Sequence, residues 1–275
     1  MQETSFSTKY FSSLAEGTIR TTVDHVAQTF RSSNQPDPRN DNRGCLSYVL
    51  QQQYKGYKNQ DKNVKKQKAL PLIVLRELHK NKTTVKNIAI AQLCIGTIFF
   101  AMLSCEYLRT NIPEERKLTN TLLLHNIRFY VKGRQAPHYH PRLALSETVT
   151  TTFEFQKSDE QHESVTMHCS GCTLLCPVRP WSSIVRRVIS YPGTTIDTWV
   201  NTILFKNSLK KISSTTARTN IRSAAGIVRE DVLGFALADI GTHYIRSGAA
   251  MHMYLAQVPT FSITMIGRWS SDAFL

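Results

Sequence analysis

One uncharged run, residues 88–105 (IAIAQLCIGTIFFAMLSC), constrains the fold more than any other part of the chain. So much apolar surface has to leave water, either into a protein core or into a bilayer. The run is about as long as the shortest segment that spans a membrane. Gln92, Thr97 and Ser104 interrupt it, however, and no second span follows. We therefore expect a long buried helix in a globular core, with a membrane-associated protein as the alternative.

The chain is strongly basic. It contains 34 Lys and Arg against 20 Asp and Glu, which gives a net charge of +14 at pH 7. Such a surplus attracts polyanions, so nucleic acid or an acidic membrane surface is the expected partner. Hydrophobic residues make up 41% of the 275 positions, an ordinary value for a globular protein that argues against wholesale disorder.

A lysine-rich segment, residues 54–68, suggests where the chain divides. It holds six lysines against one acidic residue, Asp61, and such a charge run predicts a solvated basic linker. A more specific hypothesis is that this linker crosses the phosphate backbone of a nucleic acid. We therefore expect a partial helical domain with this linker over residues 1–68 and a second domain over residues 69–275. The candidate DNA-binding lysines are Lys55, Lys58, Lys62, Lys65, Lys66 and Lys68.

Hydrophobic periodicity predicts the secondary structure. Residues 13–31, with apolar Ile19, Val23, Val26 and Phe30, match an amphipathic helix, and a second helix starts near residue 46. Further helices are expected at 69–82, 88–105, 181–192, 196–205, 210–227 and in the last block, 239–275. Alternating residues predict strands at 127–131, 149–155 and 165–167. The expected fold is mainly α with a small antiparallel β-sheet (α+β).

The cysteines raise the question of a metal site. The N-terminus has no basic-then-apolar leader, so we expect an intracellular protein with reduced thiols. Cys169, Cys172 and Cys176 lie close in sequence beside His168, which is compatible with zinc. Because no second pair follows at a recognisable finger spacing, we expect no metal, and a zinc protein remains the alternative.

Two short motifs near the C-terminus carry a family resemblance. His243-x-x-Arg246 is followed by small residues, and Gly267-Arg268-Trp269 follows about two helices later. Together they resemble the tyrosine recombinases, or phage-integrase family, and in particular the integrase-like proteins of protist mobile elements. The resemblance covers roughly residues 70–275, and the N-terminal part is more loosely similar to the family's core-binding domain.

The resemblance implies DNA breaking and rejoining. In the family, a tyrosine hydroxyl attacks the scissile phosphate to form a 3′-phosphotyrosine. Two arginines, a His, and a further His or Trp hold the non-bridging oxygens, and a hairpin Lys protonates the leaving oxygen. Fixed cationic donors suit this chemistry because negative charge develops in the transition state. Arginine suits it further because its planar fork donates two parallel bonds and stays protonated.

The family's roles transfer to this chain residue by residue. His243 and Arg246 match the His-x-x-Arg pair, and their spacing places both on one helix face. Lys157, at a strand end beside a turn, matches the hairpin lysine. Trp269 fills the His/Trp position by residue type, whereas the family spacing from Gly267 favours Arg268, and both options stay open.

The first arginine of the family pattern is missing. Family members carry it in an Arg-x-x-Glu turn after an apolar helix, and the matching positions here are Leu103 and Glu106. Removing one preorganised donor typically costs about 10²–10³ in rate. By the family spacing the nucleophilic tyrosine would fall at position 277, two residues beyond Leu275. We therefore expect a degenerate or truncated recombinase homologue that does not cleave DNA.

The expected partners follow from the same resemblance. We expect double-stranded DNA and a homo-oligomer assembled on it, with no membrane and no small-molecule cofactor. In a eukaryote the nucleus is the expected location. The rival interpretation is a non-enzymatic DNA- or protein-binding module that retains the recombinase fold.

Overall fold

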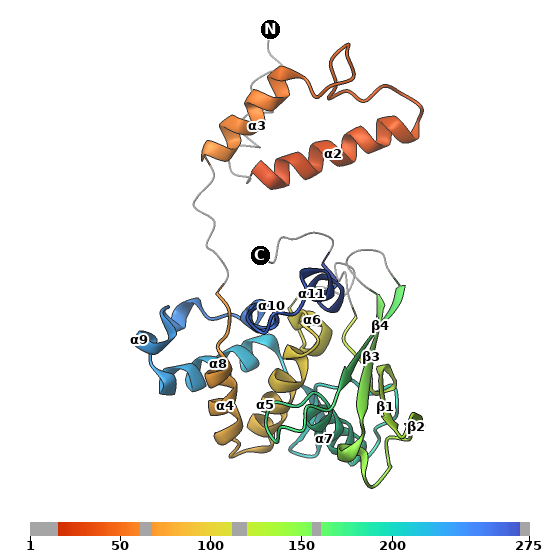
Figure 1. Ribbon diagram of the computed structural model, residues 1–275, viewed down its shortest axis with the longest axis vertical. Coiled ribbons are helices and arrows are strands. Elements are labelled where there is room, and N and C mark those ends of the chain that lie inside the picture. Colours follow the sequence, from red (N-terminus) through yellow and green to blue (C-terminus); the bar gives the residue numbers. More distant parts are fainter. Residues whose placement is uncertain (1–15, 61–67, 112–119, 156–160, 270–275) are drawn as a thin grey trace. The chain divides into compact units, whose positions relative to one another are not determined.

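The computed structural model describes residues 16–60, 68–111, 120–155 and 161–269, and its chain forms two compact units (Figure 1). The first unit comprises Met1–Lys66 and the second Gln67–Leu275. The fold is mainly α with small antiparallel sheets, so the expected α+β class is confirmed.

The first unit contains two helices, α2 (Glu16–Ser32) and α3 (Tyr48–Gln60). Ile19 of α2 is buried, and Tyr54 of α3 is buried beneath the Arg20 guanidinium, whose carbon lies 4.7 Å from the ring centre. Val26 and Phe30 are 50% and 43% exposed, so only part of the predicted apolar stripe packs inside this unit.

The predicted linker is partly helical. Because α3 continues to Gln60, the expectation of a linker from residue 54 is wrong as far as residue 60. Lys55 and Lys58 are exposed on this helix, and Lys68 is exposed just before α4. The other three candidate lysines, Lys62, Lys65 and Lys66, lie outside the described residues.

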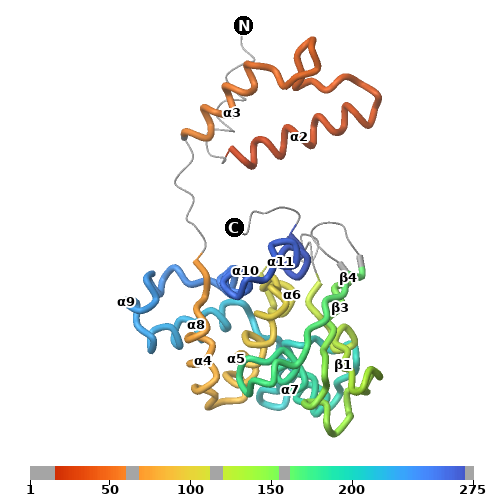
Figure 2. The backbone as a smooth tube through the Cα atoms, in the orientation of Figure 1, coloured from red at the N-terminus to blue at the C-terminus, as the bar shows by residue number. Residues whose placement is uncertain are grey.

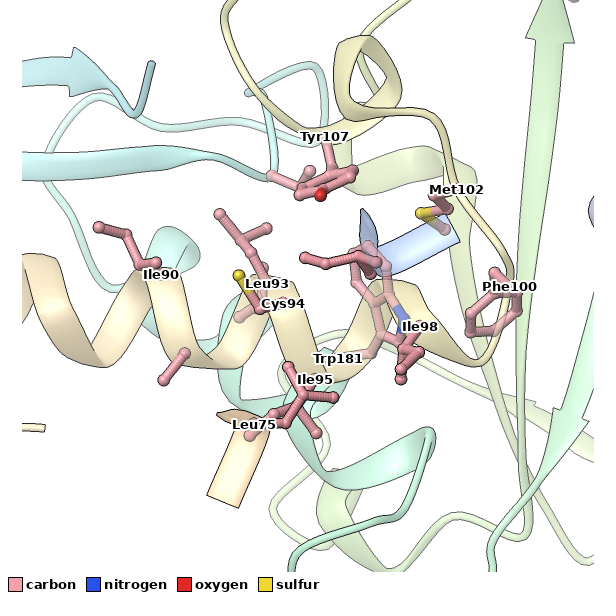
Figure 3. Close-up of a cluster of buried hydrophobic side chains, with 14 of the residues drawn as sticks. Leu75, Ile90, Leu93, Cys94, Ile95, Ile98, Phe100, Met102, Tyr107 and Trp181 are labelled. Carbon is pink, nitrogen blue, oxygen red and sulfur yellow. The ribbon is translucent and has the colours of Figure 1, made fainter. Parts of the chain in front are cut away.

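The core of the second unit forms around α5 (Val85–Ile98), which is buried for most of its length. Figure 3 shows Leu93, Ile95 and Ile98 of α5 near Trp181, whose indole nitrogen donates to the Gly96 carbonyl at 3.2 Å. Two further helices, α4 (Leu72–Lys80) and α7 (Val178–Ile189), pack against α5. Within the described ranges, the chain has no helix with the length and apolarity needed to cross a bilayer.

The sequence predicted one long helix over the apolar run, and this prediction is wrong. It stops at Ile98, turns through Ala101 at φ 44°, and resumes as α6 (Ser104–Tyr107), a path that can be followed in Figure 2. The Thr97 carbonyl accepts from the backbone N–H of both Phe100 and Met102, which tightens this turn. The turn brings Glu106 back toward the end of α5.

The main sheet confirms the strand predictions. Its strands are β1 (Ile127–Val131), β2 (Arg134–Ala136), β3 (Thr148–Phe155) and β4 (Gln161–His168), all antiparallel in the order β2-β1-β3-β4. Val149 pairs with Met167, so the predicted alternating positions share a face. Lys132 and Gly133 have φ values of 51° and 71°, as a two-residue hairpin turn requires.

A second hairpin stands where the sequence predicted a helix over residues 196–205. It consists of β5 (Thr202–Phe205) and β6 (Ser208–Lys211). Lys206 and Asn207, with φ values of 48° and 58°, form its two-residue turn. Asn tolerates this backbone region, so the turn chemistry outweighed the helical spacing of the apolar residues.

The remaining helices complete the second unit. Gly248 of α10 packs directly on the chain before α4, because a Cβ there would lie 2.7 Å from the Leu70 carbonyl oxygen. The Leu70 N–H also donates to the Tyr244 carbonyl at 3.0 Å. The predicted C-terminal helices are thus present and anchored. The elements not yet given are α8 (Ser214–Val228), α9 (Glu230–Leu233), α10 (His243–Leu255), α11 (Thr260–Gly267), η2 (Leu124–Asn126), η3 (Leu143–Leu145) and η4 (Leu237–Asp239).

Candidate functional site

Several of the predicted site residues meet at the turn between α5 and α6. Arg246 comes from the first turns of α10, and Arg268 directly follows α11. Both guanidinium groups donate to backbone carbonyls of this turn, Arg246 to Ala101 at 2.9 Å and Arg268 to Phe100 at 3.1 Å. The two arginines therefore connect the C-terminal helices to the end of α5.

Arg268 forms a buried ion pair. Its Nη2 donates to Glu106 Oε2 at 2.9 Å, and its Nη1 also donates to the Ile266 carbonyl at 3.1 Å. The guanidinium carbon lies 3.6 Å from the centre of the Phe153 ring. The Arg268 side chain is 1% exposed, so this guanidinium cannot meet a phosphate without leaving its pocket.

We call the cluster of Arg246, Arg268 and Glu106 at the α5–α6 turn the Arg268 corner. Glu106 lies at its centre. Its Oε2 accepts from the Leu103 backbone N–H at 2.7 Å, which caps α6, as well as from Arg268. The Glu106 side chain is only 2% exposed. A carboxylate so buried needs a counter-ion, and Arg268 supplies one. Leu103 is partly buried and brings no charge to the position where the family pattern has an arginine.

The guanidinium of Arg246 also donates its hydrogen bonds to backbone carbonyls. Besides Ala101, it donates through Nη2 to the Gly267 carbonyl at 2.6 Å. Burial lowers the pKa of Arg246 to about 10, with the Glu106 charge acting in the opposite direction and the Arg268 charge in the same one. The group therefore remains cationic at neutral pH. As whole residues, Arg246 and Arg268 are both partly buried.

Trp269 covers the other side of Arg246. The guanidinium carbon of Arg246 lies 4.5 Å from the Trp269 ring centre, a cation–π distance. Gly267 lies under the same indole, because a Cβ there would come within 1.7 Å of a ring atom. Arg268 and Trp269 thus take different roles: Arg268 points inward to Glu106, and Trp269 packs on Arg246. Which of them fills the family's His/Trp position stays a prediction.

His243 is not drawn into this cluster. It is the first residue of α10 and is exposed, one turn before Arg246. Among the described residues, its imidazole makes no hydrogen bond or ion pair with Arg246, Arg268 or Glu106. His243 and Arg246 lie on the same helix, as expected, but their side chains contact different groups. The predicted hairpin lysine, Lys157, lies outside the described residues.

The possible zinc site has a close pair of thiols. The Sγ atoms of Cys169 and Cys176 lie 3.6 Å apart, and Cys172 Sγ accepts from the Leu175 N–H at 3.3 Å. In the part of the chain that the structure describes, no three His, Cys, Asp or Glu side chains are grouped to hold a metal ion. The zinc hypothesis therefore has no complete ligand set there.

Sequence reasoning missed the partner of Glu106 and a charged triad elsewhere. A cationic partner for Glu106 could have been suspected, because a carboxylate between apolar segments needs a buried cation. In the triad, His125 Nε2 lies 2.8 Å from Glu154 Oε1 and its Nδ1 lies 2.9 Å from Asp197 Oδ1. Nothing in the sequence spacing indicated that these three side chains would meet.

Comparison with known proteins gives structural matches only. No family model matches the chain, and no curated protein matches it. The chain is similar to the XerH site-specific recombinase bound to its difH substrate in a pre-cleavage complex, with 13% identity and a TM-score of 0.45. It is also similar to the Tn1549 transposon integrase in complex with circular intermediate DNA, with 10% identity and a TM-score of 0.46. The alignments cover 95% and 94% of this chain, and 66% and 73% of the other two chains. This chain therefore spans just under two thirds of the XerH chain.

Proposed function

We propose that this chain is a DNA-binding homologue of the tyrosine recombinases that does not cleave DNA. The observation that carries the proposal is the buried pair of Arg268 and Glu106, next to the uncharged position Leu103. Three motif residues, Arg246, Arg268 and Trp269, meet at this corner, yet Arg268 neutralises the buried carboxylate of Glu106. The cluster therefore supports a recombinase-like placement of these residues in which the charges around the site are arranged differently.

Phosphoryl transfer needs several fixed donors around the phosphate at once. Leu103 offers none, and Arg268 is buried against Glu106. Arg246 is partly buried and His243 is exposed, and these two remain as described candidates for a phosphate contact. The missing donor at Leu103 typically costs about 10²–10³ in rate, and the burial of Arg268 adds a second loss of that size if Arg268 is the residue that fills the His/Trp position.

DNA binding rests on charge rather than on the catalytic cluster. The net charge of +14 favours a polyanion, and Lys55, Lys58 and Lys68 are exposed. We expect double-stranded DNA as the ligand, a homo-oligomer on that DNA, and a location inside the cell, in the nucleus of a eukaryote.

Fluorescence anisotropy with a labelled duplex tests DNA binding. We expect the logarithm of the affinity to fall steeply and linearly with the logarithm of the salt concentration, because lysine contacts to phosphates release counterions. Lys55→Gln and Lys58→Gln should reduce that slope, whereas Lys80→Gln, outside the lysine-rich segment, is the matched control. A flat salt response would overturn the proposal.

A nicked suicide duplex tests the loss of cleavage separately. This substrate traps a covalent protein–DNA intermediate whenever strand cleavage occurs. We expect no adduct on a denaturing gel, for the chain as it stands and for its Arg246→Gln variant. An adduct would show that Leu103 and the Arg268–Glu106 pair are compatible with cleavage, and would refute the inactive assignment.

A second candidate function, a protein-binding module, is favoured by one observation. Five large apolar side chains of α10 and α11 are between 46% and 74% exposed: Met251, Tyr254, Leu255, Phe261 and Met265. Exposed apolar groups gathered on neighbouring helices are typical of interaction surfaces. Sedimentation of wild type and Phe261→Asp tests self-association through this face, with Leu145→Asp, also exposed, as the control.

A further inference from the structure

The segment that joins the main sheet to α7 carries two thiols in contact. Cys169 directly follows β4, which ends at His168, and Cys176 lies two residues before α7, which begins at Val178. Their Sγ atoms are 3.6 Å apart, a contact in which one sulfur donates a hydrogen bond to the other. We call Cys169 and Cys176 the thiol pair. It shares no residue with the Arg268 corner.

The backbone around the thiol pair keeps the two sulfurs together. The Cys169 N–H donates to the Glu147 carbonyl at 2.7 Å, which fixes the first member beside the sheet. In the loop that follows, Ser170 Oγ donates to the Leu175 carbonyl at 2.6 Å and accepts from the Cys172 N–H at 3.2 Å. The loop is therefore closed by its own hydrogen bonds, with the two sulfurs at its base.

The surroundings of Cys176 favour its thiolate. Burial raises the pKa of Cys176, but hydrogen bonds donated to its sulfur outweigh this effect, so the pKa is lowered. The donors are the backbone N–H groups of Arg179, Ser170 and Val178 and the thiol of Cys169. Val178 and Arg179 are the first two residues of α7, and the N-terminus of a helix stabilises a negative charge. A thiolate thus lies in contact with a thiol, the arrangement from which a disulfide forms.

Two other cysteines provide the comparison. Cys94, in α5, is 1% exposed, and burial raises its pKa to about 12, so this thiol stays neutral and shielded. Cys172 is exposed, and its Sγ accepts from the Leu175 N–H at 3.3 Å. Because Cys172 lies between Cys169 and Cys176 in the sequence, it is the thiol that can compete with them for a bond. The contact between sulfurs distinguishes the thiol pair.

We propose that Cys169 and Cys176 form a reversible disulfide on reaction with a low-molecular-weight disulfide such as oxidised glutathione, and that this bond stabilises the junction of the main sheet and α7. A disulfide bond is about 2.05 Å long, so the sulfurs have to approach each other by about 1.5 Å. Rotation of two side chains in a loop supplies such a movement without displacing a strand or a helix. This modification site is independent of the DNA-binding proposal.

The reaction is a two-step thiol–disulfide exchange. The partly exposed Cys169 passes its proton to the Cys176 thiolate, and its sulfur attacks one sulfur of oxidised glutathione. That S–S bond breaks, and the first glutathione leaves as a thiolate. Cys176 then loses the proton, which reaches this thiolate through solvent, and attacks the Cys169 sulfur to release the second glutathione. Two electrons pass from the protein to the oxidant, which ends as two molecules of glutathione.

Disulfide mapping in the full chain tests the assignment. The protein is treated with an excess of oxidised glutathione, alkylated and cleaved with chymotrypsin. Cleavage after Leu174 or Leu175 separates Cys169 from Cys176, so a disulfide between them holds two peptides together until a reductant is added. We expect the linked peptides in wild type, with the alkyl label on Cys172, and also in Cys172→Ser. Absence of linked peptides in Cys172→Ser, or a wild-type label on Cys169, would overturn the proposal.

Melting temperatures test whether the bond forms without strain. The disulfide would bridge positions seven apart, and closing such a loop restricts the unfolded chain. We expect oxidised Cys172→Ser to melt about 5 °C above its reduced form, and a reductant should reverse the rise. Cys169→Ser, treated in the same way, is the control that should show no rise. An unchanged or lower melting temperature in oxidised Cys172→Ser would overturn the stabilising disulfide.

Discussion

The Arg268 corner and the side chain of Asn201 show opposite outcomes of burying polar groups in one domain. At the corner, Arg268 donates to Glu106 and to two carbonyls, and its side chain is almost fully buried. At Asn201, both amide atoms are buried without any partner. Satisfied groups hold a fold together, whereas buried unsatisfied groups cost folding free energy. The residues expected to do chemistry therefore maintain structure, and a residue that no motif indicated lowers stability.

The largest effect should come from breaking the corner. Arg268→Met would leave the Glu106 carboxylate buried without its counter-ion, which typically costs about 3–5 kcal/mol of unfolding free energy. Urea denaturation followed by circular dichroism measures this. The double variant Arg268→Met with Glu106→Gln should recover much of the loss, because no isolated charge remains. A single variant as stable as wild type would mean that the pair is not structural.

A smaller effect is expected from Gly267→Ala at the same corner. The added methyl group would collide with the Trp269 ring, since a Cβ there lies 1.7 Å from a ring atom. Such overpacking typically costs about 1–3 kcal/mol, and the shifted indole should change the tryptophan emission spectrum. Gly241→Ala is the matched control, because nothing lies within 4 Å of its Cβ position. Equal melting temperatures for both variants would contradict the packing described for Trp269.

At Asn201 the sign should reverse. Asn201→Leu should raise the unfolding free energy by about 1 kcal/mol, since it removes two unsatisfied polar atoms. Chemical denaturation provides the measurement, with Asn126→Leu as the contrast. Asn126 donates to Glu154 and should therefore lose stability on substitution. If both variants are destabilised alike, the Asn201 amide is satisfied in solution and the contrast between the two regions fails.

The smallest expected effect is a pH dependence at His125. Desolvation lowers the pKa of His125, but the hydrogen bonds to Glu154 and Asp197 outweigh it, so the folded-state pKa is raised above 6.5. The stabilisation is then complete below the unfolded-state pKa of about 6.5 and is lost as the pH rises through the raised folded-state value. Melting temperatures between pH 5.5 and pH 8 should fall more for wild type than for His125→Gln, using about the range over which histidine titrates. Parallel profiles would mean that Glu154 and Asp197 do not stabilise the protonated form of His125.

Local patterns predicted the elements that local interactions determine. The alternation in residues 149–155 predicted β3, and apolar spacing predicted α7 and α10. The break after Ile98 was missed because Gly96 lies inside the helix and no Pro or Gly follows Ile98 in the apolar run, and the turn depends on the tight bonding of the Thr97 carbonyl. The β5–β6 hairpin was missed because its turn residues, Lys206 and Asn207, interrupt a segment whose apolar spacing resembles a helix.

The candidate site was predictable in its residues but not in their partners. The motifs named Arg246, Arg268 and Glu106, and the structure brings these three together. No spacing rule indicated that Arg268 would pair with Glu106, because 162 positions separate them. The Asn201 amide left no sequence signal, since a buried unpartnered asparagine looks like any other asparagine. Burial and hydrogen-bond partners are properties of the folded chain.

The bonds that close the α5–α6 turn also set an order for biosynthesis. The Ala101 carbonyl finds Arg246 145 positions later, and Glu106 finds Arg268 162 positions later. Such high contact order makes closure slow relative to local helix formation. On a ribosome, α5 would emerge well before either guanidinium, so α4 and α7 could cover part of its apolar surface early, whereas the end of α5 would stay open until α10 and α11 arrive.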